Sequence, residues 1–308
     1  MSTQYRPNGK GTILQTLLWA PGDMETLKLS NTIRAYIMEL VGVTLFALVI
    51  NMAVSLSYAT ADTLLSGVLV GILGGGAYHM IGSWTRTSAG NEMDYELARH
   101  LSWSVSLGHF LVGRLGLVYL LFYLVVQTGG SCIAGGFLYY FGNGVVPFSL
   151  TTLAVPAGPI VFNYGFSWML EILGSTFIVF SILYNNYLAR YLPAAGTDVE
   201  ESHIHHGQYL GGVMRGIWTA IFLSKAAYSF DAVVYIAGTI GTCSSAAGCL
   251  GGASNGWPFY VFVPLLGSVG AAILYLPLIA LFTWGRSEKQ MTSRRHRQRG
   301  TATAEDGE

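Results

Sequence analysis

The sequence predicts an all-helical membrane protein with six transmembrane helices, and two observations support this fold class. Of the 308 residues, 52% are hydrophobic and only 10% are charged, whereas a soluble chain carries about 25% charged residues. The apolar residues form continuous runs of about 20, the length at which a helix crosses the bilayer core. Such runs favour helices over a barrel, whose strands alternate in segments of about ten residues.

The chain divides into one predicted membrane domain, residues 34–284, and two flanking segments. The predicted transmembrane helices are residues 35–56, 63–84, 115–139, 161–184, 207–223 and 258–284. Residues 1–33 form a predicted cytoplasmic N-terminal segment. The polar tail, 285–308, is rich in charge and is predicted to be a disordered cytoplasmic extension.

The positions of the basic residues predict the orientation in the bilayer. Lys and Arg collect on the cytoplasmic side of membrane proteins. All but Arg215 and Lys225 lie before the first span, between the second and third, after the fourth or after the sixth. We therefore expect both termini in the cytoplasm of a multi-pass protein of the cell membrane. The 16 basic residues balance 16 acidic ones, which argues against a nucleic-acid partner.

An internal repeat divides the domain into two halves of three spans. Residues 38–42, around Glu39, match residues 170–174, around Glu171, at a separation of 132. Residues 123–130, which contain Gln127 and Gly130, match residues 260–267, which end at Gly267, at a separation of 137. Because each half has an odd number of spans, the halves must have opposite topology, and such repeats place a solute path at the midplane. The alternative is a duplication retained for packing alone.

Two short amphipathic segments, 101–112 and 223–234, occupy equivalent places in the two halves. Neither is long enough to span a bilayer. We expect each to be a re-entrant half-helix, with the positive ends of the two helix dipoles directed at one point. Such a point repels cations and orients a polar neutral solute.

At these residues the chain resembles the major intrinsic proteins, the aquaporin and glycerol-channel superfamily. The resemblance covers about residues 34–284, and the family's H-L-N-P-A-V-T-L-G, G-R and Y-x-x-A-Q-x-x-G patterns carry it. The matching residues are His100, Leu101, Val105, Leu107, Gly108, Gly113, Arg114, Tyr123, Gln127 and Gly130. The resemblance implies six transmembrane helices, two re-entrant half-helices in an inverted repeat, and a homotetramer.

The chain departs from the family at both Asn-Pro-Ala motifs. The residues at those places, which are the candidate pore and selectivity residues, are Ser102, Trp103 and Ser104 in the first half and Ser224, Lys225, Ala226 and Ala227 in the second. Family asparagines donate hydrogen bonds to the solute, and Ser102 and Ser224 can each donate one through the hydroxyl. The larger Trp103 is expected to narrow the path. Lys225 replaces the missing filter arginine, snorkels to the surface or pairs with Asp231.

Three buried polar residues are expected to brace the re-entrant loops. The resemblance implies that Glu39 and Glu171 accept hydrogen bonds from those loops, and Gln127 matches a family glutamine beside them. The alternative for the glutamates is a proton path. A carboxylate inside the membrane is costly unless it is paired, so either role needs partners.

A histidine cluster is the one candidate metal site. His203, His205 and His206 either bind a metal or sense pH, or they lie in a solvated cytoplasmic loop. We favour the loop and predict no metal or other cofactor. The sequence has no nucleotide-binding loop, zinc spacing or nucleophile elbow, so no enzyme activity is expected.

The predicted function is passive permeation of water or a small neutral solute such as glycerol. The predicted partners are the lipid bilayer, the solute and other copies of the chain. The alternative is a non-transporting structural or interaction protein built on a degenerate channel scaffold, which Trp103 and the missing asparagines favour.

Overall fold

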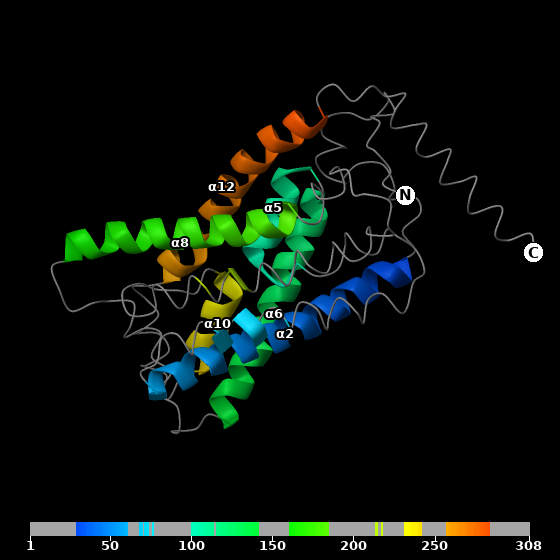
Figure 1. The fold of residues 1–308 in the computed structure, drawn as a ribbon. Coiled ribbons are helices and arrows are strands. Elements are labelled where there is room, and N and C mark those ends of the chain that lie inside the picture. Colours follow the sequence, from blue (N-terminus) through cyan, green and yellow to red (C-terminus); the bar gives the residue numbers. More distant parts are fainter. Residues whose placement is uncertain are drawn as a thin grey trace, which may run out of the picture.

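The computed structural model describes residues 29–60, 100–113, 115–141, 160–184, 231–241 and 257–283, with single positions between 68–76 and 213–217. The regular elements among these residues are all helices, and these residues contain no strand, as predicted (Figure 1). The helices are α2 (Leu29–Thr60), α5 (Trp103–Leu111), α6 (Leu117–Phe141), α8 (Ile160–Leu183), α10 (Ala232–Gly241) and α12 (Trp257–Thr283).

Three of the described helices are long and apolar enough to cross a membrane. The apolar stretches are Ala35–Met52 in α2, Leu117–Phe141 in α6 and Val261–Leu278 in α12, and α8 contains a shorter one, Trp168–Leu183. The prediction of helices long and apolar enough to cross a membrane is confirmed for these three. The predicted spans 63–84 and 207–223, and the flanking segments 1–28 and 285–308, lie outside the described residues apart from single positions.

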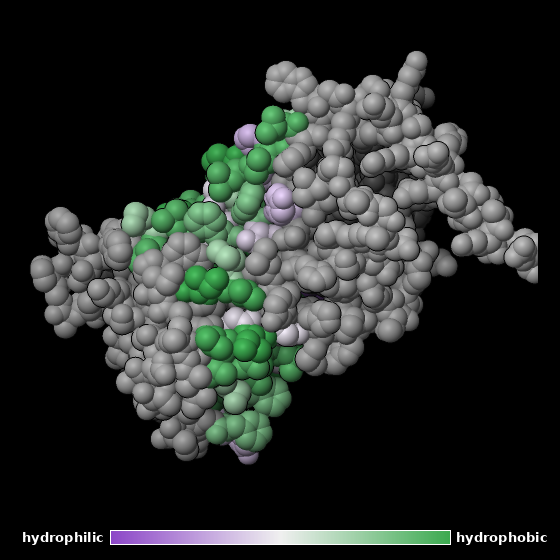
Figure 2. All heavy atoms as spheres, viewed as in Figure 1, coloured by the Kyte–Doolittle hydropathy of each residue, from purple (hydrophilic) through white to green (hydrophobic). Residues whose placement is uncertain are grey.

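The surfaces of the long helices are apolar. On the face shown in Figure 2, the described residues form a mostly hydrophobic band. The exposed fractions are 69% for Val125, 64% for Ile273 and 63% for Leu281. Water-soluble monomers rarely expose apolar patches on this scale, whereas lipid tails solvate them. Pro264 and Pro277 lie inside α12, and neighbouring helices make such prolines tolerable in a membrane helix.

The long helices pack in two pairs, and each short helix contacts both. Helix α2 packs against α6, and α8 packs against α12. The short helix α5 contacts α12 and α8 of the second half as well as α6. The short helix α10 contacts α6 and α2 of the first half as well as α12 (Figure 1). Each short helix therefore contacts long helices of the half to which it does not belong.

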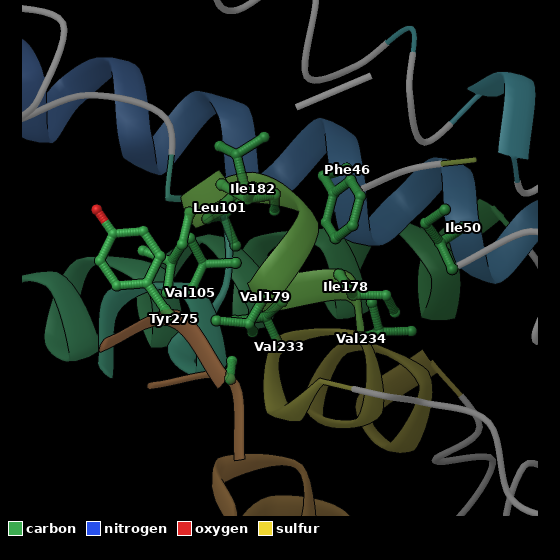
Figure 3. Packing of buried hydrophobic residues seen from close by; sticks show 13 residues of the cluster. Phe46, Ile50, Leu101, Val105, Ile178, Val179, Ile182, Val233, Val234 and Tyr275 are labelled. Carbon is green, nitrogen blue, oxygen red and sulfur yellow. The ribbon is translucent and has the colours of Figure 1, made fainter. Parts of the chain in front are cut away.

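One apolar cluster joins the two halves. Its buried side chains come from α2, α5, α8, α10 and α12, and from Leu101, which lies just before α5. They point toward one another (Figure 3). Phe46, Leu101 and Val233 are each 0% exposed in this cluster. Because lipid tails are as apolar as these side chains, close van der Waals packing, and not transfer from water, is what such a cluster contributes once the helices meet.

The second short helix lies later in the chain than predicted. The predicted segment was 223–234, and residues 223–230 lie outside the described residues. The described helix, α10, begins at Ala232 and continues to Gly241, past the predicted end at Val234. The reason is local. Asp231 is a strong helix-capping residue followed by an apolar run, which is a helix start signal.

Candidate functional site

The start of α5 is fixed by a serine cap. Ser102 has an extended backbone and its hydroxyl accepts a hydrogen bond from the Val105 N–H at 3.3 Å. This satisfies one of the N–H groups that a helix leaves unpaired at its first turn. The preceding residue, Leu101, has a φ of 52°. It is the one non-glycine residue at positive φ in the described part of the chain, so the turn into α5 is strained.

The carboxylate of Glu39 holds this strained turn in place. Glu39 lies on α2 and is 0% exposed. Its Oε2 accepts from the His100 N–H at 3.2 Å, and its Oε1 accepts from the Leu101 N–H. The side chain of Gln127, on α6, donates to Oε1 at 2.7 Å. A buried carboxylate thus receives three hydrogen bonds, two of them from the backbone immediately before the Ser102 cap.

A second layer of polar side chains surrounds this carboxylate. Gln127 Nε2 also donates to Ser106 Oγ at 2.9 Å, and Ser106 Oγ lies 3.0 Å from His100 Nδ1. A serine hydroxyl has one proton and two acceptor positions, so it bonds His100 Nδ1 while it accepts from Gln127, and the tautomer of His100 sets the direction of the first bond. Hydrogen bonds between side chains therefore connect α2 to α6 and α6 to α5.

The ring of His100 is held by two aromatic neighbours. It stacks on His109, with ring centroids 4.3 Å apart, and on Tyr123, at 4.6 Å. His109 Nδ1 lies 2.8 Å from the carbonyl oxygen of Val105. A carbonyl only accepts, so this nitrogen carries a proton. This stacking holds His100, the residue before the strained turn, between α5 and α6.

The start of α10 carries a carboxylate cap. Asp231 is 1% exposed, and its Oδ1 accepts from the Val233 N–H at 2.9 Å. The Asp231 carbonyl oxygen accepts from the Tyr235 N–H at 3.3 Å, which begins the helical hydrogen-bond pattern. The two short helices therefore begin alike, each with a buried side chain that caps its own first turn.

Trp103 packs against two apolar clusters that contain residues of α10. It is the first residue of α5. One cluster contains Val233 and Val234, and the other contains Ala232, so both include residues of the first turn of α10. The indole Nε1 of Trp103 and the hydroxyl of Ser104 are buried and have no hydrogen-bond partner among the described residues.

Hydrogen bonds also fasten each short helix to the opposite half. Ser268, on α12, donates through its hydroxyl to the Ser104 carbonyl oxygen at 2.6 Å. Asn51, on α2, donates to the Val234 carbonyl oxygen at 3.1 Å. Both acceptors lie in the first turn of a short helix, so neither short helix can leave the opposite half without breaking one of these bonds.

The repeat is visible in the helix contacts. A Cβ added to Gly130 would lie 2.8 Å from the Leu40 carbonyl oxygen, and one added to Gly267 would lie 2.8 Å from the Thr176 N–H nitrogen. Gly130 and Gly267 are the glycines that the sequence repeat pairs. Gly130 lies where α6 meets α2, and Gly267 lies where α12 meets α8. The equivalent close approaches in the two halves support a common origin.

The predicted site residues fall into three groups. Glu39, Gln127, Ser102, Trp103 and Ser104 lie together around the start of α5, as described above. Glu171 is 0% exposed on α8. The other candidates, Ser224, Lys225, Ala226, Ala227, His203, His205 and His206, lie outside the described residues. Across the described residues, no group of three or more His, Cys, Asp or Glu is placed to hold a metal ion.

Sequence reasoning overlooked Asn51 and Ser268, and it named Asp231 only as a partner for Lys225 and not as a helix cap. Asp231 had a signal, because an acidic residue before an apolar run is a helix start. The sequence signal for Asn51 is weaker: an amide inside an apolar span needs a hydrogen-bond partner. Ser268 had none, because serine is common in membrane helices and often bonds its own backbone.

No protein-family model matches the chain, and no curated protein matches it either. Function is therefore inferred from the contacts of the described residues and from the motif residues.

Proposed function

We propose that the chain is a channel of the major-intrinsic-protein type that passes water or a small neutral solute such as glycerol. In this proposal the described helices belong to a six-span, multi-pass protein of the cell membrane with both termini in the cytoplasm. Helices α5 and α10 are its two re-entrant half-helices. The subunits assemble as homotetramers, as the resemblance implies.

The single observation that carries the proposal is the junction of α5 and α10. Two helices of nine and ten residues, too short to span a bilayer, begin at buried caps and contact each other inside the bundle. A chain that needed only packing could use continuous spanning helices. Helix starts buried in a membrane protein are tolerated where the backbone is enclosed in protein or lines an aqueous path.

The hydrogen bonds around Glu39 support the same proposal. Re-entrant backbone needs partners for its N–H groups, because hydrocarbon supplies none. Glu39 supplies two of them immediately before Ser102. A carboxylate in this position keeps the first turn of α5 free to direct its N–H groups and the Ser102 side chain at a solute.

The alternative function is a non-transporting membrane protein, and Trp103 favours it. The indole lies where the two short helices meet, and it packs against two apolar clusters there. An apolar constriction closes a channel by dewetting. We therefore expect lower permeability than in a typical channel of this architecture.

Osmotic swelling of proteoliposomes tests the proposal. We expect stopped-flow light scattering to show faster entry of water, glycerol or urea than into empty liposomes. The double variant Ser102→Asn with Trp103→Pro should be faster still, because asparagine caps well and proline is favoured at the first helical position. Trp168→Ala, which truncates a tryptophan that is 46% exposed on α8, is the matched control and should resemble the wild type.

A gain in the double variant alone would support a channel narrowed by Trp103. Rates equal to those of empty liposomes in both proteins, with helical content confirmed by circular dichroism, would contradict the channel and favour the structural alternative.

A further inference from the structure

Two tyrosine hydroxyls are buried where α2 packs against α6. Tyr36 lies on α2, and Tyr123 lies on α6 and is 0% exposed. Their rings are in edge contact, with centroids 5.3 Å apart. Both hydroxyl oxygens are shielded from solvent, and neither has a hydrogen-bond partner among the described residues. Buried hydroxyls almost always have a partner, either a protein group or an ordered water, so these two need one.

Other polar groups lie beside these hydroxyls. The Tyr123 hydroxyl interacts electrostatically with the hydroxyls of Tyr36 and Tyr119, and also with the carboxylate of Glu39. Gln127 lies four residues beyond Tyr123, on the same face of α6. Its Nε2 donates to Glu39, but its Oε1 is buried and, within the part of the chain that the structure describes, accepts no hydrogen bond. The contact between α2 and α6 therefore contains polar atoms that the hydrogen bonds around Glu39 leave unsatisfied.

The chemistry of these atoms favours water as their partner. A tyrosine hydroxyl donates and accepts, whereas an amide oxygen and a carboxylate only accept. A partner for this set must therefore both donate and accept, and an internal water does so, with about three hydrogen bonds to buried polar groups. The Glu39 carboxylate disfavours an anion. No group of three or more His, Cys, Asp or Glu in the described ranges is placed to hold a metal ion.

We infer that the contact between α2 and α6 binds an internal water, held by the hydroxyls of Tyr36 and Tyr123. Hydrocarbon offers these hydroxyls no hydrogen bond, and the water supplies one to each. It also links α2 to α6 beside the bond from Gln127 to Glu39. This site lies within the first half of the repeat, and the inference does not depend on the proposed channel function.

Deleting one hydroxyl tests the inference by the sign of the change in stability. A hydroxyl bound to water loses a hydrogen bond on deletion, whereas deletion of an unpaired buried hydroxyl removes a destabilising group. We expect Tyr123→Phe to lower the melting temperature of the full chain in detergent by about 2–4 °C, the shift for one lost hydrogen bond in a large domain. Tyr36→Phe should have a similar effect.

The double variant and a surface variant complete the set. Tyr36→Phe with Tyr123→Phe should melt close to the single variants, because both hydroxyls bind the same water and their effects are not additive. Tyr140→Phe makes the same chemical change on α6, where the side chain is 74% exposed. It should melt with the wild type.

Radiolytic footprinting detects the water directly. X-rays generate hydroxyl radicals from bound water as well as from bulk water, so a fully buried side chain is oxidised where a bound water lies next to it. We expect mass spectrometry to show oxidation of Tyr123 in the wild type and slower oxidation in Tyr36→Phe. Phe46 is the matched control, because it is also 0% exposed but lies in the apolar cluster that joins the two halves. It should stay unmodified.

Three results would overturn the inference. A melting temperature of Tyr123→Phe equal to or above that of the wild type would mean that the hydroxyl has no partner. A lower melting temperature without oxidation of Tyr123 would mean that its partner is a protein group. Equal oxidation of Tyr123 and Phe46 would mean that the radicals come from bulk water. Because footprinting uses the wild-type chain, it decides between water and no water even if a variant does not fold.

Discussion

At the scale of single residues, the most informative group is the carboxylate of Glu39. A charge in the middle of an apolar helix costs several kcal/mol unless it is paired. Glu39 is paired by three donors, from His100, Leu101 and Gln127. These bonds fix a turn that contains Leu101 at positive φ. The energetic cost of both the charge and the turn is offset by the same hydrogen bonds.

Replacing Glu39 by alanine should therefore destabilise the protein strongly. The change strands buried donors, at about 1–3 kcal/mol for each, and releases the strained turn. We expect a clear fall in melting temperature in detergent, followed by tryptophan fluorescence. Ile37→Ala is the matched control, because Ile37 lies on the same helix and is 53% exposed. Equal melting temperatures for the two variants would show that Glu39 does not brace the turn.

The polar residues differ in how far the sequence predicts their place. Glu39 and Gln127 stand out because each is polar inside an otherwise apolar span. Ser224, Lys225 and Asp231 are all polar residues near the expected start of the second short helix. The residue separation between the two halves of the repeat is what distinguishes them. The pairs Ser268 with Ser104 and Asn51 with Val234 join residues 164 and 183 positions apart. No local pattern encodes such a pair.

At the scale of elements, close helix packing depends on glycines at the crossings. Gly135, on α6, faces α10, and a Cβ there would lie 2.5 Å from the Ile240 Cβ and 2.9 Å from the Ala237 carbonyl oxygen. A Cβ on the next residue, Gly136, would meet nothing within 4 Å. Small residues at interfaces allow backbones to approach in membrane proteins. Comparing the same substitution at Gly135 and at Gly136 therefore separates the effect of packing from that of helix propensity.

Gly135→Ala should destabilise the protein by about 1–3 kcal/mol, the usual cost of overpacking. Gly136→Ala should be neutral or stabilising by up to about 1 kcal/mol, because alanine is the better helix former. Chemical unfolding in mixed micelles measures both changes. A similar destabilisation in the two variants would mean that α6 and α10 do not pack as described.

The long helices were the most predictable elements. Predicted spans 35–56, 115–139, 161–184 and 258–284 lie almost entirely within α2, α6, α8 and α12, because long apolar runs have few alternatives in a bilayer. The short helices were less predictable, since their boundaries depend on caps. Helix α5 begins close to its predicted place, whereas α10 is shifted toward Gly241.

At the scale of the whole molecule, the two halves are interlocked. Each short helix belongs to one half and is fastened to the other by packing and by a hydrogen bond to its first turn. The sequence repeat predicts two equivalent halves, but it does not determine how they contact one another. That arrangement follows from side chains that are ordinary in their own helices and matter only when the halves meet.

The proposed function depends on α5 and α10 beginning beside one another. The most direct measurement is a crosslink between Trp103→Cys and Ala232→Cys, in a chain whose natural cysteines are replaced by serine. A short bifunctional thiol reagent, followed by mass spectrometry of peptides, detects the link. Ser104→Cys with Ser268→Cys is the positive control, since the Ser268 hydroxyl bonds the Ser104 carbonyl oxygen.

Trp103→Cys with Leu281→Cys is the negative control. Leu281 lies 13 residues beyond Ser268 on α12, or about 20 Å along the helix at 1.5 Å per residue. We predict an intramolecular link for Trp103→Cys with Ala232→Cys, at a yield close to that of the positive control. A link in the positive control but none between these two positions would contradict the meeting of the two short helices and the proposed function built on it.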